Sequence, residues 1–253
     1  MLHRARKVAI VGTRSPTPYG LTQATRFARA LACHGVCVVS GMARGIDETV
    51  HGAALDAGGS TIAILGCGVD RPWPAGPLAE RIGVEGLLLS EYAPGTRPRR
   101  HHFPLRNRLI SGLCDAVLVL EAARASGSLI TARWASDQGR TVFVVPGRVD
   151  HPMSAGVLRL LREGASPVGG PEELLSDLYG TERRGEEDRL DRAGLPGGLG
   201  GRVLGALVGE SPTTDELALR LGEPVSEVLA AVATLELEGR LARCPGGVLR
   251  LLE

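Results

Sequence analysis

Six short apolar runs, rich in β-branched residues, constrain the fold of this chain more than any other feature. They show almost no alternation of polar and apolar residues, which is typical of a parallel sheet that helices cover on both faces. Segments with helical spacing separate the runs, so the sequence predicts a doubly wound, mostly parallel α/β domain. The predicted strands are Val8–Val11, Val36–Ser40, Thr61–Leu65, Gly86–Ser90, Ala116–Leu120 and Thr141–Val145, and the predicted helices are Leu21–His34, Ile46–Ala57, Pro104–Leu113 and Ser128–Gln138.

The composition changes beyond this domain. Residues 179–202 combine dense charge with a glycine-rich end, which is typical of a linker. Three short helices and a terminal hairpin are expected next, and that order predicts a winged-helix domain. We therefore expect an α/β domain over 1–178, a linker over 179–202 and a winged helix over 203–253. Its predicted elements are helices Val203–Val208, Thr214–Leu221 and Val225–Glu238, and strands Leu241–Arg243 and Val248–Leu251.

Positive charge is concentrated in the first domain. Residues 1–170 hold 20 basic and 12 acidic side chains, a net charge of +8, whereas residues 203–253 hold 4 and 8, a net charge of −4. Lys7 is the only lysine, so nearly every positive charge is a guanidinium. Guanidinium groups form paired hydrogen bonds with phosphate oxygens and stack on bases. Genomic composition is the alternative cause of this arginine bias.

The cysteines and the apolar runs bear on the location of the protein. Five cysteines occur without a CxxC pair or a histidine at ligand spacing, so we expect reduced thiols and no metal. No signal-peptide pattern is evident at the N-terminus, and no apolar run approaches the ~20 residues of a membrane span. These features predict a cytoplasmic protein with no membrane span.

Two glycine-containing turns follow the first two predicted strands. Gly12-Thr13-Arg14 follows the first, and SGMARGID, which includes Gly41, Arg44 and Gly45, follows the second. Glycine lets the backbone approach a ligand, and an adjacent arginine can then reach a phosphate. An ordinary turn with an exposed arginine is the alternative. Asp47 either caps the following helix or holds one of the arginines in place.

The stretch FPLRNRLISGL contains the most specific binding pattern. Pro104 suits the first helical position, so Arg106, Asn107 and Arg108 are expected in the opening turns of a helix, as phosphate and base ligands. Gly127 and Ser128 open a second helix after the fifth strand, and free N–H groups at such a start attract anions. Because ligands bind beyond the carboxyl ends of parallel strands, we expect these two sites to converge.

Catalytic patterns are weak by comparison. The GCG turn lacks the dinucleotide fingerprint, which would have to follow the first strand, so no nicotinamide cofactor is expected. SGS is not the GxSxG elbow of hydrolases. His101 and His102 are adjacent and should diverge rather than chelate a metal. Glu91 and Glu121 follow strands and are expected to order the arginines rather than act as an acid and a base.

Taken together, these strings resemble the DprA (Smf) family of DNA-processing proteins. The resemblance covers residues 5–165 in consecutive order and includes GTR, SGMARGID, SEYAPG, FPLRNR and EAARASGSLITARWASDQGR. A weaker similarity extends to LELEGRLARCPGG in the last domain. Trp73 stands where the family usually has tyrosine, which keeps an aromatic ring, and Leu158 stands where asparagine is frequent.

The resemblance implies an extended Rossmann domain that binds single-stranded DNA in a basic pocket, forms homodimers and delivers RecA recombinase to incoming DNA during natural transformation. It implies no catalysis and no cofactor. By motif match it assigns DNA-contact or pocket roles to Arg14, Gly41, Arg44, Gly45, Arg106, Asn107, Arg108, Gly127, Ser128 and Thr131.

Three expectations complete this interpretation. The predicted recognition helix of the winged helix contains Glu227, Glu236 and Glu238 and no basic residue, so we expect this domain to contact a protein or support a dimer rather than bind DNA. The alternative is that arginines of the wing still contact DNA, namely Arg240, Arg243 and Arg250. The dimer face is expected within Val157–Leu178, where a closing helix of the domain is an equally good account. The alternative function is a nucleotide phosphoribohydrolase-like enzyme on the same scaffold, although SGSLIT replaces the PGGxGT turn of such enzymes.

Overall fold

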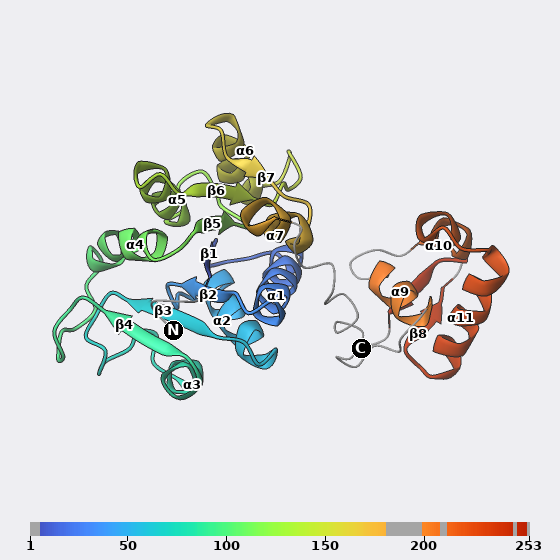
Figure 1. Ribbon diagram of the computed structural model, residues 1–253, viewed down its shortest axis with the longest axis horizontal. Helices are drawn as coiled ribbons and strands as arrows, with labels where there is room; N and C mark the ends of the chain where they lie inside the picture. The colour runs from blue at the N-terminus through green and yellow to red at the C-terminus, as the bar shows by residue number, and fades with distance from the viewer. Residues whose placement is uncertain (1–5, 181–198, 208–211, 245–246, 252–253) are drawn as a thin grey trace. The chain divides into compact units, whose positions relative to one another are not determined.

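A computed structural model describes residues 6–180, 199–207, 212–244 and 247–251. The chain divides into two compact units, residues 1–181 and 182–253. The first unit contains a seven-stranded sheet with the order β4-β3-β2-β1-β5-β6-β7, in which every neighbouring pair is parallel (Figure 1). Its strands are β1 (Lys7–Val11), β2 (Cys37–Ser40), β3 (Thr61–Leu65), β4 (Leu87–Ser90), β5 (Ala116–Val119), β6 (Thr141–Val144) and β7 (Ser166–Pro167). The predicted doubly wound fold is confirmed.

Helices cover both faces of this sheet because alternate strand residues point in opposite directions. Val8 and Ile10 of β1 pack in one core with α1 and α2, whereas Ala9 and Val11 pack in a second core with α4 and α5. Figure 1 shows α1 and α2 on one side of the sheet and α4 and α5 on the other. The helices of this unit are α1 (Pro18–Cys33), α2 (Ile46–Asp56), α3 (Pro77–Glu85), α4 (His102–Gly112), α5 (Ser128–Asp137), α6 (Ala155–Arg162) and α7 (Pro171–Tyr179).

The predicted helical segments are present with shifted ends, and further elements were not predicted. Helix α3 lies in a segment to which no element was assigned, and strand β7 interrupts the segment Val157–Leu178, for which a dimer face or a closing helix was expected. The segment Val157–Leu178 contains most of α6 and α7, and Val157, Leu160 and Leu174 are buried in the cores of this unit. Helices in this segment therefore close the α/β domain, as one of the two alternatives predicted. A dimer face in the same segment stays a prediction.

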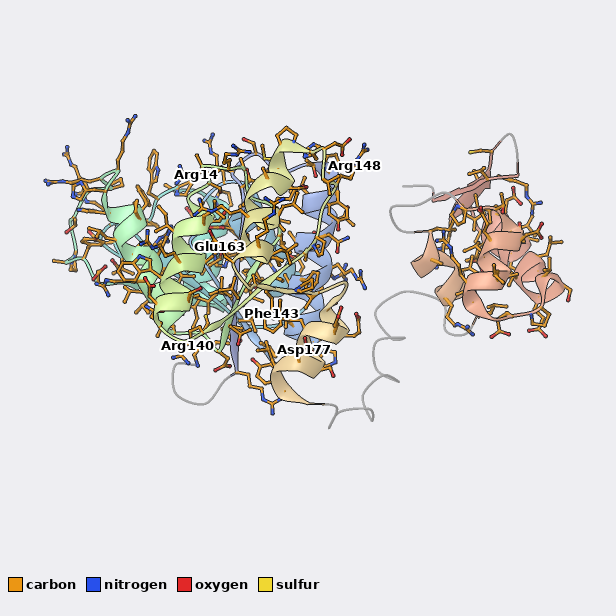
Figure 2. The ribbon with its side chains drawn as sticks, turned by 90° about the horizontal axis from the view of Figure 1, so that it is seen from above. Arg14, Arg140, Phe143, Arg148, Glu163 and Asp177 are labelled. Carbon is orange, nitrogen blue, oxygen red and sulfur yellow. The ribbon has the colours of Figure 1, made fainter. Side chains whose placement is uncertain are left out.

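The sheet order fixes where a ligand can bind. The strand order reverses at the neighbours β1 and β5, and ligands of such sheets bind beyond the carboxyl ends of the strands near that point. Figure 2 shows Arg14 and Arg148, which follow β1 and β6, at one edge of the unit and Arg140, which precedes β6, at the opposite edge. The loops after β1, β2 and β5, which contain or lead to Arg14, Arg44 and Ser128, therefore lie on one side of the unit.

The second unit contains α9 (Leu199–Ala206), α10 (Thr214–Leu221), α11 (Val225–Leu237) and an antiparallel pair, β8 (Leu241–Arg243) and β9 (Leu249–Leu251). These are the three helices and the hairpin of the predicted winged helix. Val203, Leu217, Val228 and Val232 form its core. Helix α9 begins inside the segment assigned to the linker, and residues 181–198 of that segment lie outside the described residues. Within the part of the chain that the structure describes, no helix is long and apolar enough to cross a bilayer.

Candidate nucleic-acid interface

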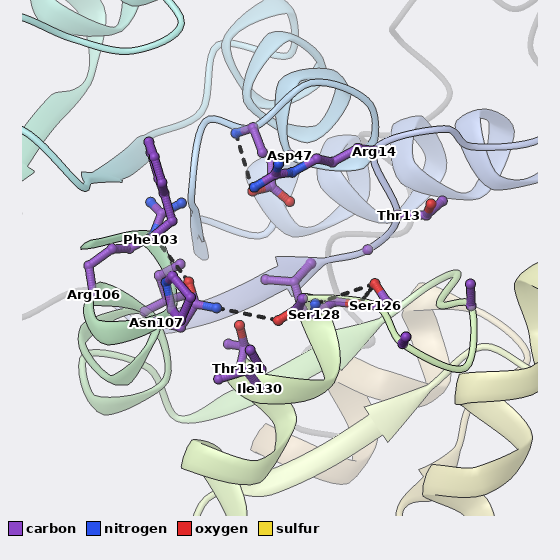
Figure 3. A pocket seen from close by; sticks show the side chains of 18 residues that line it. Thr13, Arg14, Asp47, Phe103, Arg106, Asn107, Ser126, Ser128, Ile130 and Thr131 are labelled. Carbon is purple, nitrogen blue, oxygen red and sulfur yellow. Dashed lines mark hydrogen bonds between the residues drawn. The ribbon is translucent and has the colours of Figure 1, made fainter. Parts of the chain in front are cut away.

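A cavity of about 430 Å³ opens beyond the carboxyl ends of the strands (Figure 3). We call it the α4–α5 cavity, because both of these helices contribute lining residues to it. The amide of Asn107 on α4 lies near the carbonyl of Gly127 at the start of α5, with Nδ2 3.4 Å from the oxygen. The convergence predicted from the sequence is therefore confirmed. Of the predicted site residues, Arg14, Arg106, Asn107, Gly127, Ser128 and Thr131 line this cavity.

The start of α5 is built by its own serines. The hydroxyls of Ser126 and Ser128 lie 2.7 Å apart, and the Ser128 N–H points to the Ser126 hydroxyl at 3.4 Å. The N–H of Leu129 donates to the Ser126 carbonyl at 3.2 Å. The expectation of free N–H groups at this start is therefore corrected in part, because the turn uses some of these donors itself. The hydroxyls and the positive end of the helix dipole still face the cavity.

Arg106 has a different position from the one expected of a phosphate ligand. Its side chain is only 3% exposed, and its guanidinium donates to the carbonyls of Gly41, at 2.8 Å, and Ile64. The Nε atom donates to Asn107 at 3.1 Å. Arg106 therefore forms part of the cavity wall as a buried residue, and its hydrogen bonds connect α4 to the ends of β2 and β3. Burial lowers the pKa of Arg106 to about 10, while Asp47 opposes this shift, so the group is charged at neutral pH.

Asp47 is the buried counter-charge of Arg106. Its carboxylate accepts hydrogen bonds from the N–H groups of Gly41, at 3.1 Å, and Ala43, at 3.3 Å. Burial raises the pKa of Asp47, and the charge of Arg106 acts in the opposite direction. Asp47 lies within the first turn of α2 and shapes the loop that carries Arg44, so neither predicted role, a cap of α2 or a direct hold on Arg14 or Arg44, describes it fully.

The two predicted glycines of this loop are required by close packing. A side chain on Gly41 would collide with the guanidinium of Arg106. Gly45 has φ of +86°, and a Cβ atom there would lie 2.7 Å from the carbonyl oxygen of Thr13. Gly41 therefore leaves room for Arg106, and Gly45 lets the loops after β1 and β2 approach each other. The predicted role of these glycines in bringing the backbone close to a ligand stays a prediction.

Arg14 and Arg44 are the exposed arginines of the site. Both line a second cavity of about 460 Å³, which we call the Trp73 cavity, together with Gly41 and Trp73. The two cavities adjoin, because Arg14, Ala43, Phe103 and Arg106 line both. Neither Arg14 nor Arg44 forms an ion pair with any residue in the described ranges. Their guanidinium groups thus remain available to an external anion.

Arg108 lies apart from both cavities. Its guanidinium forms an ion pair with Glu91, which directly follows β4. The expectation that Glu91 orders an arginine is confirmed. The same expectation for Glu121 is wrong, because its carboxylate accepts hydrogen bonds from the N–H of Thr17, at 2.9 Å, and from the Thr17 hydroxyl at 2.5 Å. Glu121 therefore joins the end of β5 to the start of α1.

Sequence reasoning did not include Phe103 or Ser126 in the site. Phe103 lines both cavities, with its ring 5.8 Å from the Arg106 guanidinium carbon. The sequence feature that could have predicted this role is its position directly before Pro104, at the start of α4, which begins at His102. His102 is buried and stacks on Tyr92, with ring centroids 4.1 Å apart, and its Nδ1 lies 3.0 Å from the Gly66 carbonyl oxygen. The expectation that His101 and His102 diverge is wrong, because their rings meet edge to face with centroids 4.6 Å apart. The described residues contain no group of three or more possible metal ligands.

Comparisons with known proteins agree with this geometry. Residues 1–179 match the family model of DNA recombination-mediator protein A, and residues 196–247 match that of the DprA winged helix domain. The putative DNA processing protein DprA of Mycobacterium tuberculosis (strain CDC 1551 / Oshkosh) is 42% identical over 252 residues, which cover 98% of this chain and 64% of that protein.

Solved structures give the same result. The crystal structure of DprA from Streptococcus pneumoniae matches with a TM-score of 0.65 and 40% identity, over 69% of this chain and 62% of that one. DprA from Helicobacter pylori, whose structure was described for its single-stranded DNA binding mode, matches with a TM-score of 0.65 and 36% identity, over 70% of this chain and 81% of that one. This chain spans less than two thirds of the M. tuberculosis and S. pneumoniae proteins. The matched domains and these identities place the chain in the DprA (Smf) family of DNA-processing proteins.

Proposed function

We propose that this chain binds single-stranded DNA along the carboxyl edge of its sheet and breaks no bond in it. One observation carries the proposal: Arg14 and Arg44, both exposed, flank adjoining cavities and have no ion-pair partner among the described residues. A strand that crosses this edge would place phosphates on the two guanidinium groups. Asn107 and Ser128 would add hydrogen bonds to the backbone or to a base.

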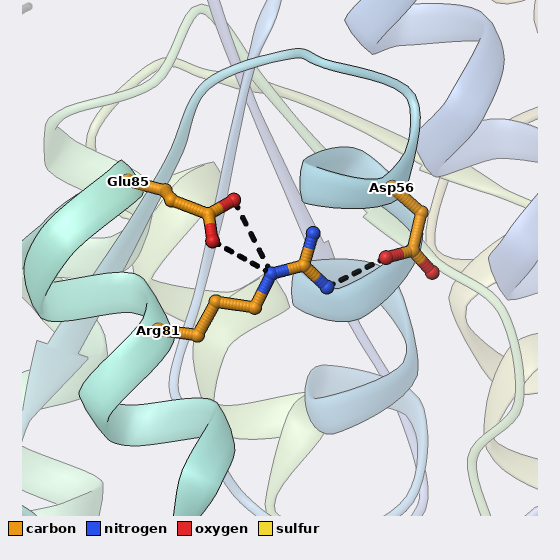
Figure 4. Close-up of polar contacts among 3 residues, drawn as sticks. All are labelled: Asp56, Arg81 and Glu85. Carbon is orange, nitrogen blue, oxygen red and sulfur yellow. Dashed lines mark hydrogen bonds and ion pairs between the residues drawn. The ribbon is translucent and has the colours of Figure 1, made fainter.

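Arg81 on α3 shows how a structural arginine differs from these two. Its Nη1 atom lies 2.6 Å from Asp56 and its Nε atom 3.0 Å from Glu85, so two carboxylates already neutralise it (Figure 4). Arg81 lines neither cavity. A phosphate would have to displace both carboxylates before it bound Arg81, whereas no carboxylate competes at Arg14. The proposed site is therefore identified by arginines that have no carboxylate partner in the described ranges, and not by the number of arginines.

Two carboxylates that follow the strands at this edge, Asp47 beside the α4–α5 cavity and Glu121, are already held by hydrogen bonds within the protein. The Asp47 carboxylate accepts two backbone N–H groups and lies beside Arg106, and the Glu121 carboxylate is held by Thr17. A general base needs a carboxylate or an imidazole within hydrogen-bond reach of the proton that it removes. Both carboxylates are already engaged in loop structure, so we propose no catalytic role for either.

Family membership extends the proposal to partners. We propose that the protein acts in the cytoplasm as a homodimer, protects incoming single-stranded DNA and loads RecA recombinase onto it. Each cavity holds only a short stretch of strand, so two linked sites would retain a long strand far better than one. Light scattering at micromolar concentration tests the dimer, and a persistent monomer contradicts it. A RecA nucleation assay on single-stranded DNA, with and without the protein, tests the loading.

A salt titration tests the DNA proposal. Binding of a short oligothymidine should weaken as salt rises, and Arg14→Ala or Arg44→Ala should each reduce the slope of log K against log salt by about one unit. Arg81→Ala removes the same charge from a paired site and should leave the slope unchanged. A duplex of the same length reports any preference for unpaired strands. Equal slopes for all three variants, or release of free base from a nucleoside monophosphate, would contradict the proposal.

A further inference from the structure

The Trp73 cavity combines an exposed aromatic side chain with two exposed arginines. Trp73 is 56% exposed, although an indole is among the side chains that gain most from burial. It lines the Trp73 cavity with Arg14, Arg44 and Phe103. An aromatic face beside unpaired guanidinium groups is the chemistry of a nucleobase flanked by phosphates, because every base offers a π-face and every nucleotide a negative charge.

The loop that carries Trp73 is held in place by its neighbours. The Gly68 N–H donates to the Thr96 carbonyl at 2.9 Å, and the Asp70 carboxylate accepts the Gly95 N–H at 2.8 Å. The loop after β3 is thus tied to the loop after β4. The thiol of Cys67, which is buried, donates to the Arg71 carbonyl at 3.0 Å. A platform that is ordered before binding loses less conformational entropy when a base stacks on it.

Trp73 lies in the same cavity as the two arginines that are proposed to bind phosphate, Arg14 and Arg44. The Trp73 cavity and the α4–α5 cavity share Arg14, Ala43, Phe103 and Arg106, so a strand can pass from one to the other. Arg14 is exposed and lines both cavities, and Arg44 lines only the Trp73 cavity. A phosphate bound by Arg14 would therefore leave the next base near Trp73, with Arg44 available for the phosphate beyond it.

We propose that Trp73 is a stacking platform for one unpaired base of the bound strand, and that Arg14 and Arg44 hold the phosphates on either side of that base. The proposal rests on the proposed DNA binding and adds a base subsite to it. Because stacking uses the π-face and not the hydrogen-bonding edges of the base, the subsite accepts purines and pyrimidines alike.

Intrinsic fluorescence tests the stack directly, because the chain has two tryptophans, Trp73 and Trp134. Trp134 lies on α5 and lines neither cavity, so Trp134→Phe leaves Trp73 as the only reporter. Titration of this variant with oligothymidine or oligoadenosine should quench Trp73 with the same midpoint as an independent anisotropy measurement. Inorganic polyphosphate, a polyanion without bases, should compete for the arginines without the same quenching. Equal quenching by polyphosphate, or no quenching by bound oligonucleotide, overturns the proposal.

Substitution gives the second test. Trp73→Ala should weaken oligothymidine binding by roughly 5- to 150-fold, the range that base–aromatic stacks contribute, and should leave the salt slope unchanged. Trp73→Tyr keeps an aromatic face and should restore most of the affinity. If Trp73→Ala binds like the wild type while Arg14→Ala still lowers the salt slope, the stack is refuted and the DNA proposal stands. If the wild type binds no single-stranded DNA, the DNA proposal itself fails.

Discussion

Mild acid should destabilise the α/β unit through one buried histidine. His51 on α2 is 0% exposed, and its Nδ1 lies 2.6 Å from the hydroxyl oxygen of Thr61. The Thr61 hydroxyl donates its only proton to the Val38 carbonyl at 2.8 Å, so Nδ1 must carry the ring proton and act as the donor. The Nε2 atom is then an acceptor, and it has no partner in the described structure.

The size of the effect follows from proton linkage. Burial, together with the charge of Arg106, lowers the pKa of His51 from 6.5 to about 3. Below pH 6.5 the unfolded chain binds a proton at this position, whereas the folded chain does not until about pH 3, so stability falls as the pH falls through that window. At pH 5 the unfolded state gains about 2 kcal/mol from this proton. This value depends mainly on the unfolded pKa, because pH 5 lies well above the folded one.

Urea unfolding at pH 7 and pH 5 measures the effect. Both tryptophans, Trp73 and Trp134, belong to the α/β unit, so their fluorescence follows this unit alone. His51→Asn keeps an N–H donor for Thr61 but cannot be protonated. The variant loses packing at both pH values. The quantity compared is therefore the change in the free energy of unfolding between pH 7 and pH 5 in each protein.

The wild type should lose about 2 kcal/mol more than the Asn variant on going from pH 7 to pH 5. Asp47 acts in the opposite direction, because a raised folded pKa makes the folded state bind its proton first, and stability from this group is lost as the pH rises. Its contribution is present in both proteins and cancels. An equal loss in wild type and variant would refute the assignment of a neutral, buried His51.

Three further predictions concern the site. Arg106→Ala should destabilise the α/β unit by ~3–5 kcal/mol in urea unfolding, because it leaves the Asp47 charge and two buried carbonyls without the guanidinium that they face. Arg14 is exposed, so Arg14→Ala should change the free energy of unfolding by less than about 0.5 kcal/mol. Similar unfolding midpoints for the two variants would contradict the burial of Arg106. Gly41→Ala should lower the unfolding midpoint by forcing Arg106 aside, while Gly127→Ala, which meets nothing within 4 Å, should be neutral. Deletion of residues 199–253 should preserve most oligothymidine affinity in anisotropy, because α11 is acidic and DNA is repelled by it; loss of most affinity would place a DNA contact in the winged helix.

The sequence by itself determined the layered α/β fold, because local periodicity is written into each segment. Strand Thr61–Leu65 and helix Thr214–Leu221 match their predicted bounds, since a continuous apolar run and a capped amphipathic repeat depend on neighbouring residues alone. The convergence of Asn107 and Gly127 was also predictable, because the loops at the carboxyl ends of parallel strands share one edge. Helix α3 was missed because it follows a loop rich in glycine and proline that obscures the period.

Only the tertiary structure decided what each arginine does. Arg106, Arg108 and Arg14 are the same residue type, and all three were predicted to contact DNA. Arg106 is nevertheless buried, Arg108 is paired with Glu91, and Arg14 is exposed without an ion pair in the described ranges. The carbonyls that hold Arg106 lie 65 and 42 residues away in the chain, so no local pattern encodes them. Burial and pairing arise from contacts between distant segments, and these contacts set which charges remain free for a ligand.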